Sequence, residues 1–420
     1  MSQKYHLKCI DCDSKLAVKK KFNFSCPGHD ALVRSIYSKK RLTVRDYPGL
    51  WRYYDWLPVE KVNDYNGKPI TYKSKALAKE LELENLYISF NGYWPEKGAD
   101  VRTCTFKEYE GAVTIQYAIE QKVKGIVVAS AGNTANAFAY MASREGLPVI
   151  LVVPKKCLCD IRVPEIDASL VKTIVLGDGD YSDAISIGRK IPTITGFVYE
   201  GGARNIARRD GLGTVLLDAA QEMKRMPDHY FQAVGSGTGA IAAWEASLRL
   251  KEDGRFNQSL PKLQLSQNLT FMPMVKAWKN RRREFIPEID MPQINNLLEI
   301  IYAIVLSNRY PPYSEKGGVY DALLSTKGET YGISKDKAVK ASNLFESLEG
   351  IDILPAAAVA VASLIQAVGE KKVNPKDYIL LNITGGGKKR LNEDTIPEEL
   401  NVDIEVSKNV STEELKRLLS

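Results

Sequence analysis

From about Lys124 onward, short apolar runs rich in β-branched residues alternate with stretches that have helical spacing. Residues 125–130 (GIVVAS) lead through a small-residue turn into residues 134–146, and Gly146 is placed to stop a helix there. Residues 149–154 (VILVVP) and 172–177 (KTIVLG) repeat the pattern. Such runs are typical of parallel strands buried under covering helices, so the sequence predicts an α/β fold.

Two later units end in glycines. Residues 231–235 (FQAVG) run into the turn SGTGA and then a helical stretch over 241–254, and residues 378–383 (YILLNI) are followed by TGGG. In doubly wound folds, ligands bind at the carboxyl ends of the strands. These turns therefore indicate where a ligand would lie.

Length, charge and cysteine content narrow the class of protein. A chain of 420 residues with 44% hydrophobic residues can form two or three domains. The start MSQKYHLKCIDC becomes charged before any apolar run develops, and no apolar stretch is long enough for a bilayer, so a cytoplasmic location is expected. The net charge of +7 is spread along the chain, which favours an ordinary solvated surface over a polyanion-binding one.

The first thirty residues contain two pairs of potential metal ligands. CIDC is followed by CPGH, and without a secretory start a disulfide framework is not expected. Two pairs with two-residue spacers could surround zinc tetrahedrally. The alternative is that these cysteines are merely small residues. The candidate metal ligands are Cys9, Cys12, Cys26 and His29.

Three further features carry candidate chemistry. Gly235, Gly237 and Gly239 follow a strand and open a helix, so backbone N–H groups there could hold a phosphate, although such glycines also occur at tight packing turns. In SAGNTANA, Asn133 would present an amide at a strand end, although an ordinary helix cap explains it equally well. Together with these two turns, Lys107 in TFKE becomes a candidate catalytic residue, because a phosphorylated cofactor with an aldehyde would need an amine to bond.

The order of these motifs resembles one family. TFKE, SAGNTA, RNIARRDGLGT, PDHYFQAVGSGTG, EGIDILPAAAVAVASL and LNITGGGKKR together are similar to the threonine synthase branch of fold type II pyridoxal-phosphate enzymes, over about residues 40–395. The CxxC region is similar to the ribbon that precedes many threonine synthases. Within the branch, LYISFNGYWPEKGADVRTCTFKE and SNRYPPYS resemble enzymes of methanogenic archaea that replace the phosphate of O-phospho-L-serine with sulfite, making L-cysteate for coenzyme M biosynthesis.

The resemblance implies a role for each matching residue. Lys107 would bond the aldehyde of pyridoxal 5'-phosphate, and Asn133 would hydrogen-bond the ring's phenolic oxygen. The stretch Gly235, Ser236, Gly237, Thr238 and Gly239 would hold the cofactor phosphate. Thr384 would face the pyridine nitrogen.

Two departures from the family concern the substrate pocket. After the lysine the chain reads KEYEG where threonine synthases read KDRG, and the loop before it is longer. Both reactants are anions, so cations are expected near them. The candidates for substrate binding are Ser130, Thr134, Lys97 and Arg102, with Arg204 and Arg208 behind them.

The implied architecture is the tryptophan synthase β-like fold, with two doubly wound parallel or mixed sheets. A ribbon-like segment would cover residues 1–35, a large cofactor-binding domain 36–110 and 191–420, and a smaller α/β domain 111–190, with the site between them. A homo-oligomer is expected. Two alternatives stay open: a threonine synthase acting on O-phospho-L-homoserine, and a zinc-ribbon protein that binds nucleic acid, which the scattered basic residues disfavour.

Overall fold

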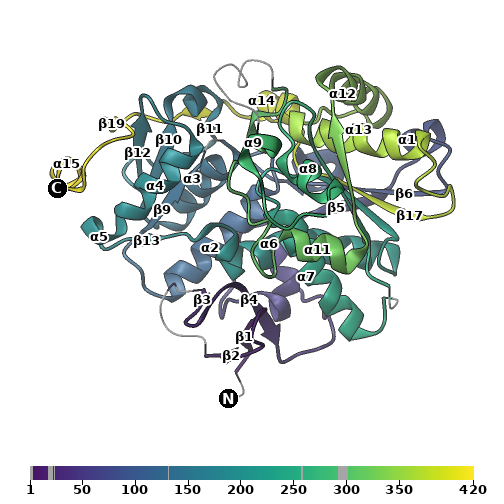
Figure 1. Ribbon diagram of the computed structural model, residues 1–420, viewed down its shortest axis with the longest axis horizontal. Helices are drawn as coiled ribbons and strands as arrows, with labels where there is room; N and C mark the ends of the chain where they lie inside the picture. Colours follow the sequence, from purple (N-terminus) through teal and green to yellow (C-terminus); the bar gives the residue numbers. More distant parts are fainter. Residues whose placement is uncertain (1–2, 18–21, 23, 131, 257–258, 292–300) are drawn as a thin grey trace.

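The computed structural model describes the whole chain apart from residues 1–2, 18–21, 23, 131, 257–258 and 292–300. Two largely parallel sheets form the body, and a small antiparallel sheet from the N-terminus lies at one end of the molecule (Figure 1). The predicted α/β class, with two parallel or mixed sheets and an N-terminal ribbon-like segment, is confirmed.

The larger sheet has six strands, and neighbouring strands run parallel except at the β5–β6 edge. Its central strands are buried along nearly their whole length, because helices cover both faces. This explains the continuous apolar runs in the sequence. In spatial order the strands are β16 (Glu329–Ile333), β15 (Lys262–Asn268), β14 (His229–Ala233), β17 (Tyr378–Ile383), β6 (Asn85–Phe90) and β5 (Ile70–Lys73).

The smaller sheet has five strands, all parallel to their neighbours. Its edge strands β13 and β19 come from outside residues 111–190, so the chain returns to this sheet near its C-terminus. The division into domains at the expected residues stays a prediction. In spatial order the strands are β13 (Val198–Tyr199), β9 (Ile126–Ala129), β10 (Val149–Pro154), β12 (Val171–Leu176) and β19 (Ile404–Val406).

Helices join the two sheets into one body. The helix α2 packs against α3 on one side and against α6 on the other, and α6 in turn packs against α7. In Figure 1, α2 and α6 lie between the strands of the five-stranded sheet at the left and those of the six-stranded sheet at the right. The α-helices are α1 (Ala76–Glu80), α2 (Lys107–Glu120), α3 (Asn133–Glu145), α4 (Tyr181–Lys190), α5 (Pro192–Thr195), α6 (Ile206–Met223), α7 (Thr238–Asp253), α8 (Pro273–Lys279), α9 (Pro287–Asp290), α11 (Val319–Thr326), α12 (Lys335–Glu349), α13 (Pro355–Gly369), α14 (Lys388–Asp394) and α15 (Thr412–Leu419).

Two pairs of short strands and five 3₁₀ turns lie outside the larger sheets of the described residues. The pairs are β7 (Tyr93–Trp94) with β8 (Ala99–Asp100), and β11 (Arg162–Val163) with β18 (Glu398–Glu399). The 3₁₀ turns are η1 (Gly49–Trp56), η2 (Pro95–Lys97), η3 (Lys155–Asp160), η4 (Gly202–Arg204) and η5 (Ile304–Leu306). Among the helices of the described residues, none combines the length and apolarity that crossing a membrane requires.

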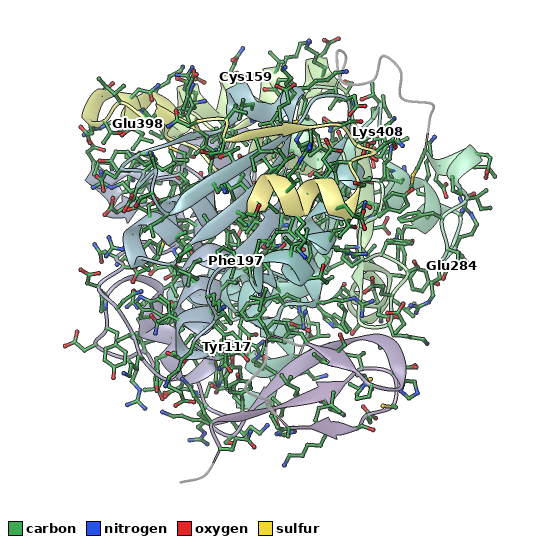
Figure 2. All side chains as sticks on the ribbon, turned by 90° about the vertical axis from the view of Figure 1, so that its left-hand side faces the viewer. Tyr117, Cys159, Phe197, Glu284, Glu398 and Lys408 are labelled. Atoms are coloured by element: carbon green, nitrogen blue, oxygen red, sulfur yellow. The ribbon has the colours of Figure 1, made fainter. Side chains whose placement is uncertain are left out.

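The N-terminal sheet is docked onto the body through buried polar and aromatic contacts. Ser35 and Tyr37 of its longest strand donate hydrogen bonds to Asp210 of α6, at 2.5 and 2.7 Å. Phe24 packs against Tyr117 of α2 with ring centroids 5.6 Å apart; Tyr117 is labelled beside this sheet in Figure 2. The four strands, in spatial order, are β2 (Lys15–Leu16), β1 (Tyr5–Cys9), β4 (His29–Tyr37) and β3 (Ser25–Cys26).

Candidate active site

A cavity of about 220 Å³ lies where strand ends of both sheets meet. The turn after β9 supplies one side of its lining, and the turns after β14 and β17 supply another. The described lining residues include most of the predicted site: Lys107, Ser130, Asn133, Thr134, Gly235, Ser236, Gly237, Thr238, Gly239 and Thr384. The structure therefore brings together residues that lie far apart in the sequence.

The glycine turn after β14 leads directly into the start of α7 at Thr238. The first N–H groups of a helix have no partner within the helix, and the helix dipole favours an anion there. The hydroxyls of Ser236 and Thr238 lie 2.9 Å apart beside this helix start. A side chain at Gly239 would meet Phe106 at 2.9 Å, so only glycine allows the turn to approach the residue before Lys107.

Backbone hydrogen bonds place Lys107 beside Thr384. The N–H of Phe106 donates to the carbonyl of Thr384 at 3.0 Å, and the N–H of Gly386 donates to the carbonyl of Cys104 at 3.0 Å. Lys107 then begins α2, with 16% of its side chain exposed at the cavity. The glycine-rich ending of β17 and the lysine are thus fixed to each other by the main chain.

The Lys107 amine lies next to a wholly buried carboxylate. Its Nζ is 3.2 Å from Oε2 of Glu110, whose side chain has no exposed surface. Burial lowers the pKa of Lys107, and the negative charge of Glu110 opposes that effect, while Arg208 adds to it. The net direction is downward, which increases the neutral, nucleophilic form of the amine.

Glu110 belongs to a chain of alternating charges whose other two members, Arg208 and Glu200, line the cavity. Arg208 of α6 hydrogen-bonds Glu110 through one Nη atom and Glu200 through the other, the latter at 2.7 Å. Burial alone would raise the pKa of Glu110, but Arg208 and Lys107 outweigh it and lower that pKa. Arg208, a predicted ligand for anions, is therefore occupied by two carboxylates.

The turn after β9 holds Asn133 and Thr134 at the start of α3. The hydroxyl of Ser130 accepts hydrogen bonds from the N–H groups of Gly132, at 3.3 Å, and Ala135, at 3.0 Å, so it shapes the turn. Thr134 donates to Glu110 at 3.1 Å. The same carboxylate thus contacts both Lys107 and this turn.

The cations at the cavity are only partly those that were predicted. Arg204 lines it and pairs with Asp30 and, at 3.3 Å, with Glu315. Arg189 of α4 lines it too, and the described residues give it no ion-pair partner within 4.0 Å.

Lys97 and Arg102 are not among the described residues that line the cavity. Lys97 Nζ lies 4.9 Å from the ring centre of Tyr72, and Arg102 pairs with Asp100 at 2.8 Å. Aromatic and acidic neighbours hold both cations elsewhere. Their contact with substrate stays a prediction that this geometry does not support.

The predicted metal ligands come together at one end of the N-terminal sheet. The ligand atoms of Cys9, Cys12, Cys26 and His29 all lie within 4.8 Å of one another. The sulfurs of Cys12 and Cys26 are 3.9 Å apart, and Nδ1 of His29 is 3.6 Å from that of Cys26. Three sulfurs and one imidazole nitrogen form a donor set suited to zinc.

The cavity fits a phosphorylated aldehyde cofactor. A helix start with two hydroxyls suits a phosphate, and an amine of lowered pKa lies beyond Phe106, which touches the same turn. Thr384 offers a neutral hydroxyl at the cavity, and it is fixed to the lysine segment. The residues present can therefore hold pyridoxal 5'-phosphate.

Three functional neighbours were not predicted from the sequence: Glu110, Glu200 and Arg189. Glu110 reaches Arg208 from 98 positions away along the chain, and Glu200 lies eight positions before Arg208 in a loop without a recognised motif. The one sequence feature that could have indicated Glu110 is that residues 107–111 read KEYEG where threonine synthases read KDRG. Arg189 carries no motif.

The fold and the cavity define a pyridoxal-phosphate dependent enzyme. The family model with that description matches residues 69–385, which is more than half of the chain. The solved structure of maize serine racemase has a TM-score of 0.57 at 14% identity, covering 77% of this chain and 90% of its own. The serine racemase from Dictyostelium discoideum has a TM-score of 0.52 at 16% identity, covering 76% and 93%. At such identities these two structures support the fold alone.

Curated relatives place the chain in a narrower group of pyridoxal-phosphate dependent enzymes. The cysteate synthase of Methanosarcina acetivorans is 52% identical over 415 residues, 98% of this chain and 99% of its own. Those of Methanocella paludicola and Methanoregula boonei are 52% and 47% identical, covering 93% and 100% of this chain and 91% and 98% of their own. The chain belongs to the cysteate synthase family of pyridoxal-phosphate dependent enzymes.

Proposed function

We propose that this protein replaces the phosphate of O-phospho-L-serine with sulfite, giving L-cysteate and phosphate for coenzyme M biosynthesis. The observation that carries the proposal is the cavity that unites Lys107, the glycine turn before α7 and cationic side chains, in a chain similar to cysteate synthases over nearly its full length. Small anionic molecules are the substrates of this proposal, and a cytoplasmic homo-oligomer is its expected form.

Each predicted cofactor residue has a role. Lys107 would bond the aldehyde, Asn133 would donate to the ring oxygen, and Thr384 would lie at the ring nitrogen. The turn from Gly235 to Gly239 would bind the phosphate through the start of α7. When bound, the cofactor supplies an electron-accepting ring that stabilises negative charge on the substrate's α-carbon.

The chain's own residues then handle protons and anions. Nζ of Lys107 takes the proton from the α-carbon as general base, which its lowered pKa favours. Ser130 and Thr134 would contact the amino acid's carboxylate at the start of α3.

Phosphate and sulfite occupy the same β-carbon in turn, so one group of cations can serve both. Arg189 and Arg204 line the cavity and suit this role, because Arg208 is held between two carboxylates.

The test uses the purified holoenzyme and a Lys107→Ala variant. Wild-type protein should form cysteate and phosphate from phosphoserine and sulfite, and Lys107→Ala should lower the rate by at least about 10³-fold and lose the absorbance of the bound cofactor. Lys79→Ala, on the exposed side of α1, is the matched control. Phosphate release from O-phospho-L-homoserine in place of phosphoserine would favour the threonine synthase alternative.

A structural zinc at Cys9, Cys12, Cys26 and His29 is the second part of the proposal. Its support is the close approach of the four ligand atoms. Metal analysis should give about one zinc per chain, as a closed four-ligand site requires. A Cys9→Ser, Cys12→Ser double variant should lose it, and an unchanged metal content would contradict this site.

A further inference from the structure

Among the described residues, Glu110 is the acidic side chain that touches both the lysine and the turn after β9. Its Oε2 is 3.2 Å from Nζ of Lys107, and its Oε1 accepts from the hydroxyl of Thr134 at 3.1 Å. Its side chain has no exposed surface, and it is not among the described residues that line the cavity. Glu110 therefore contacts the lysine from outside the lining of the cavity.

Burying the charge of a carboxylate costs free energy, so the position of Glu110 calls for an explanation. Arg208 alone would satisfy a structural ion pair, and it already pairs with Glu200 at 2.7 Å. Glu110 instead divides its two oxygens between Arg208 and Thr134 on one side and Lys107 on the other. The second oxygen is available to the amine whenever the amine is not bonded to the cofactor.

We propose that Glu110 is a positioning residue that holds the Lys107 ammonium while one anion leaves the cavity and the next one enters. The inference rests on the proposed function, specifically on Lys107 as the bonding lysine and on two successive anionic ligands.

The proton balance explains why such a residue is useful. Nζ of Lys107 takes the proton from the α-carbon, and the C–O bond to phosphate breaks with the electron pair on oxygen. The sulfur lone pair of sulfite then forms the C–S bond, and the same proton returns from Nζ to the α-carbon. Between these steps Nζ carries a full positive charge, first beside the departing phosphate and then beside the entering sulfite.

Without Glu110, that ammonium would pair with the departing phosphate or the entering sulfite, or lose its proton to either. A fixed carboxylate 3.2 Å away keeps the charge neutralised and the amine in one position. The charged groups facing Nζ are Glu110 from α2, Arg208 from α6 and, behind Arg208, Glu200.

The first measurement uses cofactor capture by the apoprotein, which does not depend on turnover. Pyridoxal phosphate is captured by the neutral amine, so the capture rate against pH reports the protonation of Nζ. Because Glu110 stabilises the ammonium, Glu110→Gln should move the midpoint of this profile to lower pH by about 1 unit or more. Glu108→Gln, the same change in the same helical turn but facing away from the cavity, should leave the midpoint in place.

The second measurement is turnover of the holoenzyme with phosphoserine and sulfite. Glu110→Gln should lower kcat about 10- to 100-fold, with a change of less than about 3-fold in KM for sulfite. Glu108→Gln should keep the wild-type kcat. An unmoved capture midpoint, or a moved midpoint with wild-type kcat, overturns the inference.

A third variant covers the case in which Glu110→Gln does not fold. Glu110→Asp keeps the charge for Arg208 but is one methylene shorter, so it should retain the fold, withdraw from Nζ and shift the midpoint in the same direction by a smaller amount. Wild-type values for Glu110→Asp in both measurements overturn the inference. If wild-type protein makes no cysteate, the proposed function fails instead, and the capture profile alone decides whether Glu110 holds the Lys107 ammonium.

Discussion

Two glutamates in the first turn of α2 have no exposed side-chain surface, yet they lie in opposite electrostatic environments. Among the described residues, the hydrogen-bond donors to Glu108 are all neutral groups: the N–H and hydroxyl of Thr103 at 2.6 and 2.8 Å, the hydroxyl of Tyr65 at 2.9 Å and the N–H of Arg102 at 3.3 Å. Glu110 instead contacts the charged ends of Lys107 and Arg208. Two positions along a helix differ by about 200°, so the pair faces opposite sides.

As a consequence, the pKa values of Glu108 and Glu110 shift in opposite directions. Burial raises the pKa of Glu108 to about 7, because hydrogen bonds from neutral donors only partly offset it. Burial acts on Glu110 in the same direction, but the two cations outweigh it and lower its pKa. Near neutral pH, Glu110 is therefore a fixed negative charge beside the lysine, while Glu108 is a titrating group away from the cavity. Burial alone does not set the charge; the nearest cation does.

The largest expected effect on the contrast between the two glutamates comes from removing Arg208, the cation that lowers the pKa of Glu110 most. Arg208→Gln leaves Glu110 and Glu200 buried without it, and should lower the free energy of unfolding at pH 8 by about 3–5 kcal/mol. In the wild type, the lowered pKa of Glu110 gives stability that is present above its ordinary pKa and lost as pH falls through the lowered value. In the variant Glu110 keeps Lys107 but loses Arg208, the larger of the two effects that lower its pKa, so that pKa should rise and the deficit should be smaller at pH 5 than at pH 8.

Urea unfolding at the two pH values measures this deficit. Arg162→Gln is the control, because Arg162 pairs with Glu399 at the surface and such pairs contribute about 0–1 kcal/mol. An equal deficit at pH 5 and pH 8 would show that Arg208 does not set the charge of Glu110.

The next largest effect concerns Glu108 itself. Its pKa is raised from 4.5 to about 7, so the folded state holds a proton that the unfolded state has released. Its contribution to stability is complete below pH 4.5 and is lost as pH rises to about 7, a change of about 3 kcal/mol. Glu108→Gln should remove this part of the pH dependence, leaving a constant offset from altered hydrogen bonds.

Unfolding free energies at pH 5 and pH 8 give the slope for wild type and variant. Glu413→Gln, on the exposed C-terminal helix α15, should retain the wild-type slope. If Glu108→Gln also retained it, Glu108 would not titrate in this range and the contrast with Glu110 would fail.

The parts of this site that the sequence predicts are those with a local cause. The glycines before α7 and the small-residue turn before α3 follow apolar strands directly, so periodicity and spacing locate them. That they meet follows from parallel strands, whose carboxyl ends share one edge. The assignment of Lys107 and Thr384 needed the family resemblance, since a lone lysine carries no local signal.

The remaining features depend on contacts between distant residues. Glu110 and Arg208 are 98 positions apart, and only the packing of α2 on α6 brings them together. Strand β19 has three residues and follows a polar segment, so its return to the five-stranded sheet has no periodic signature. Lys97 and Arg102 were expected at the cavity because of their loop, but Tyr72 and Asp100 hold them elsewhere.

The smallest expected effect is the loss of stability when the threonine that donates to each glutamate is replaced by valine. Thr103 donates to Glu108 at 2.8 Å, and Thr134 donates to Glu110 at 3.1 Å. Thr103→Val should lower the free energy of unfolding by about 1–2 kcal/mol at pH 8, where Glu108 is mostly ionised, and by clearly less at pH 5, where it is protonated. Thr134→Val should cost about the same at both values, because Lys107 and Arg208 keep Glu110 ionised at each. Urea unfolding at the two pH values measures both losses, and the informative quantity is how each loss depends on pH rather than how large it is. A pH-independent loss for Thr103→Val would mean that Glu108 is already charged at pH 5. Glu108 and Glu110 would then differ in their hydrogen-bond partners but not in their charge.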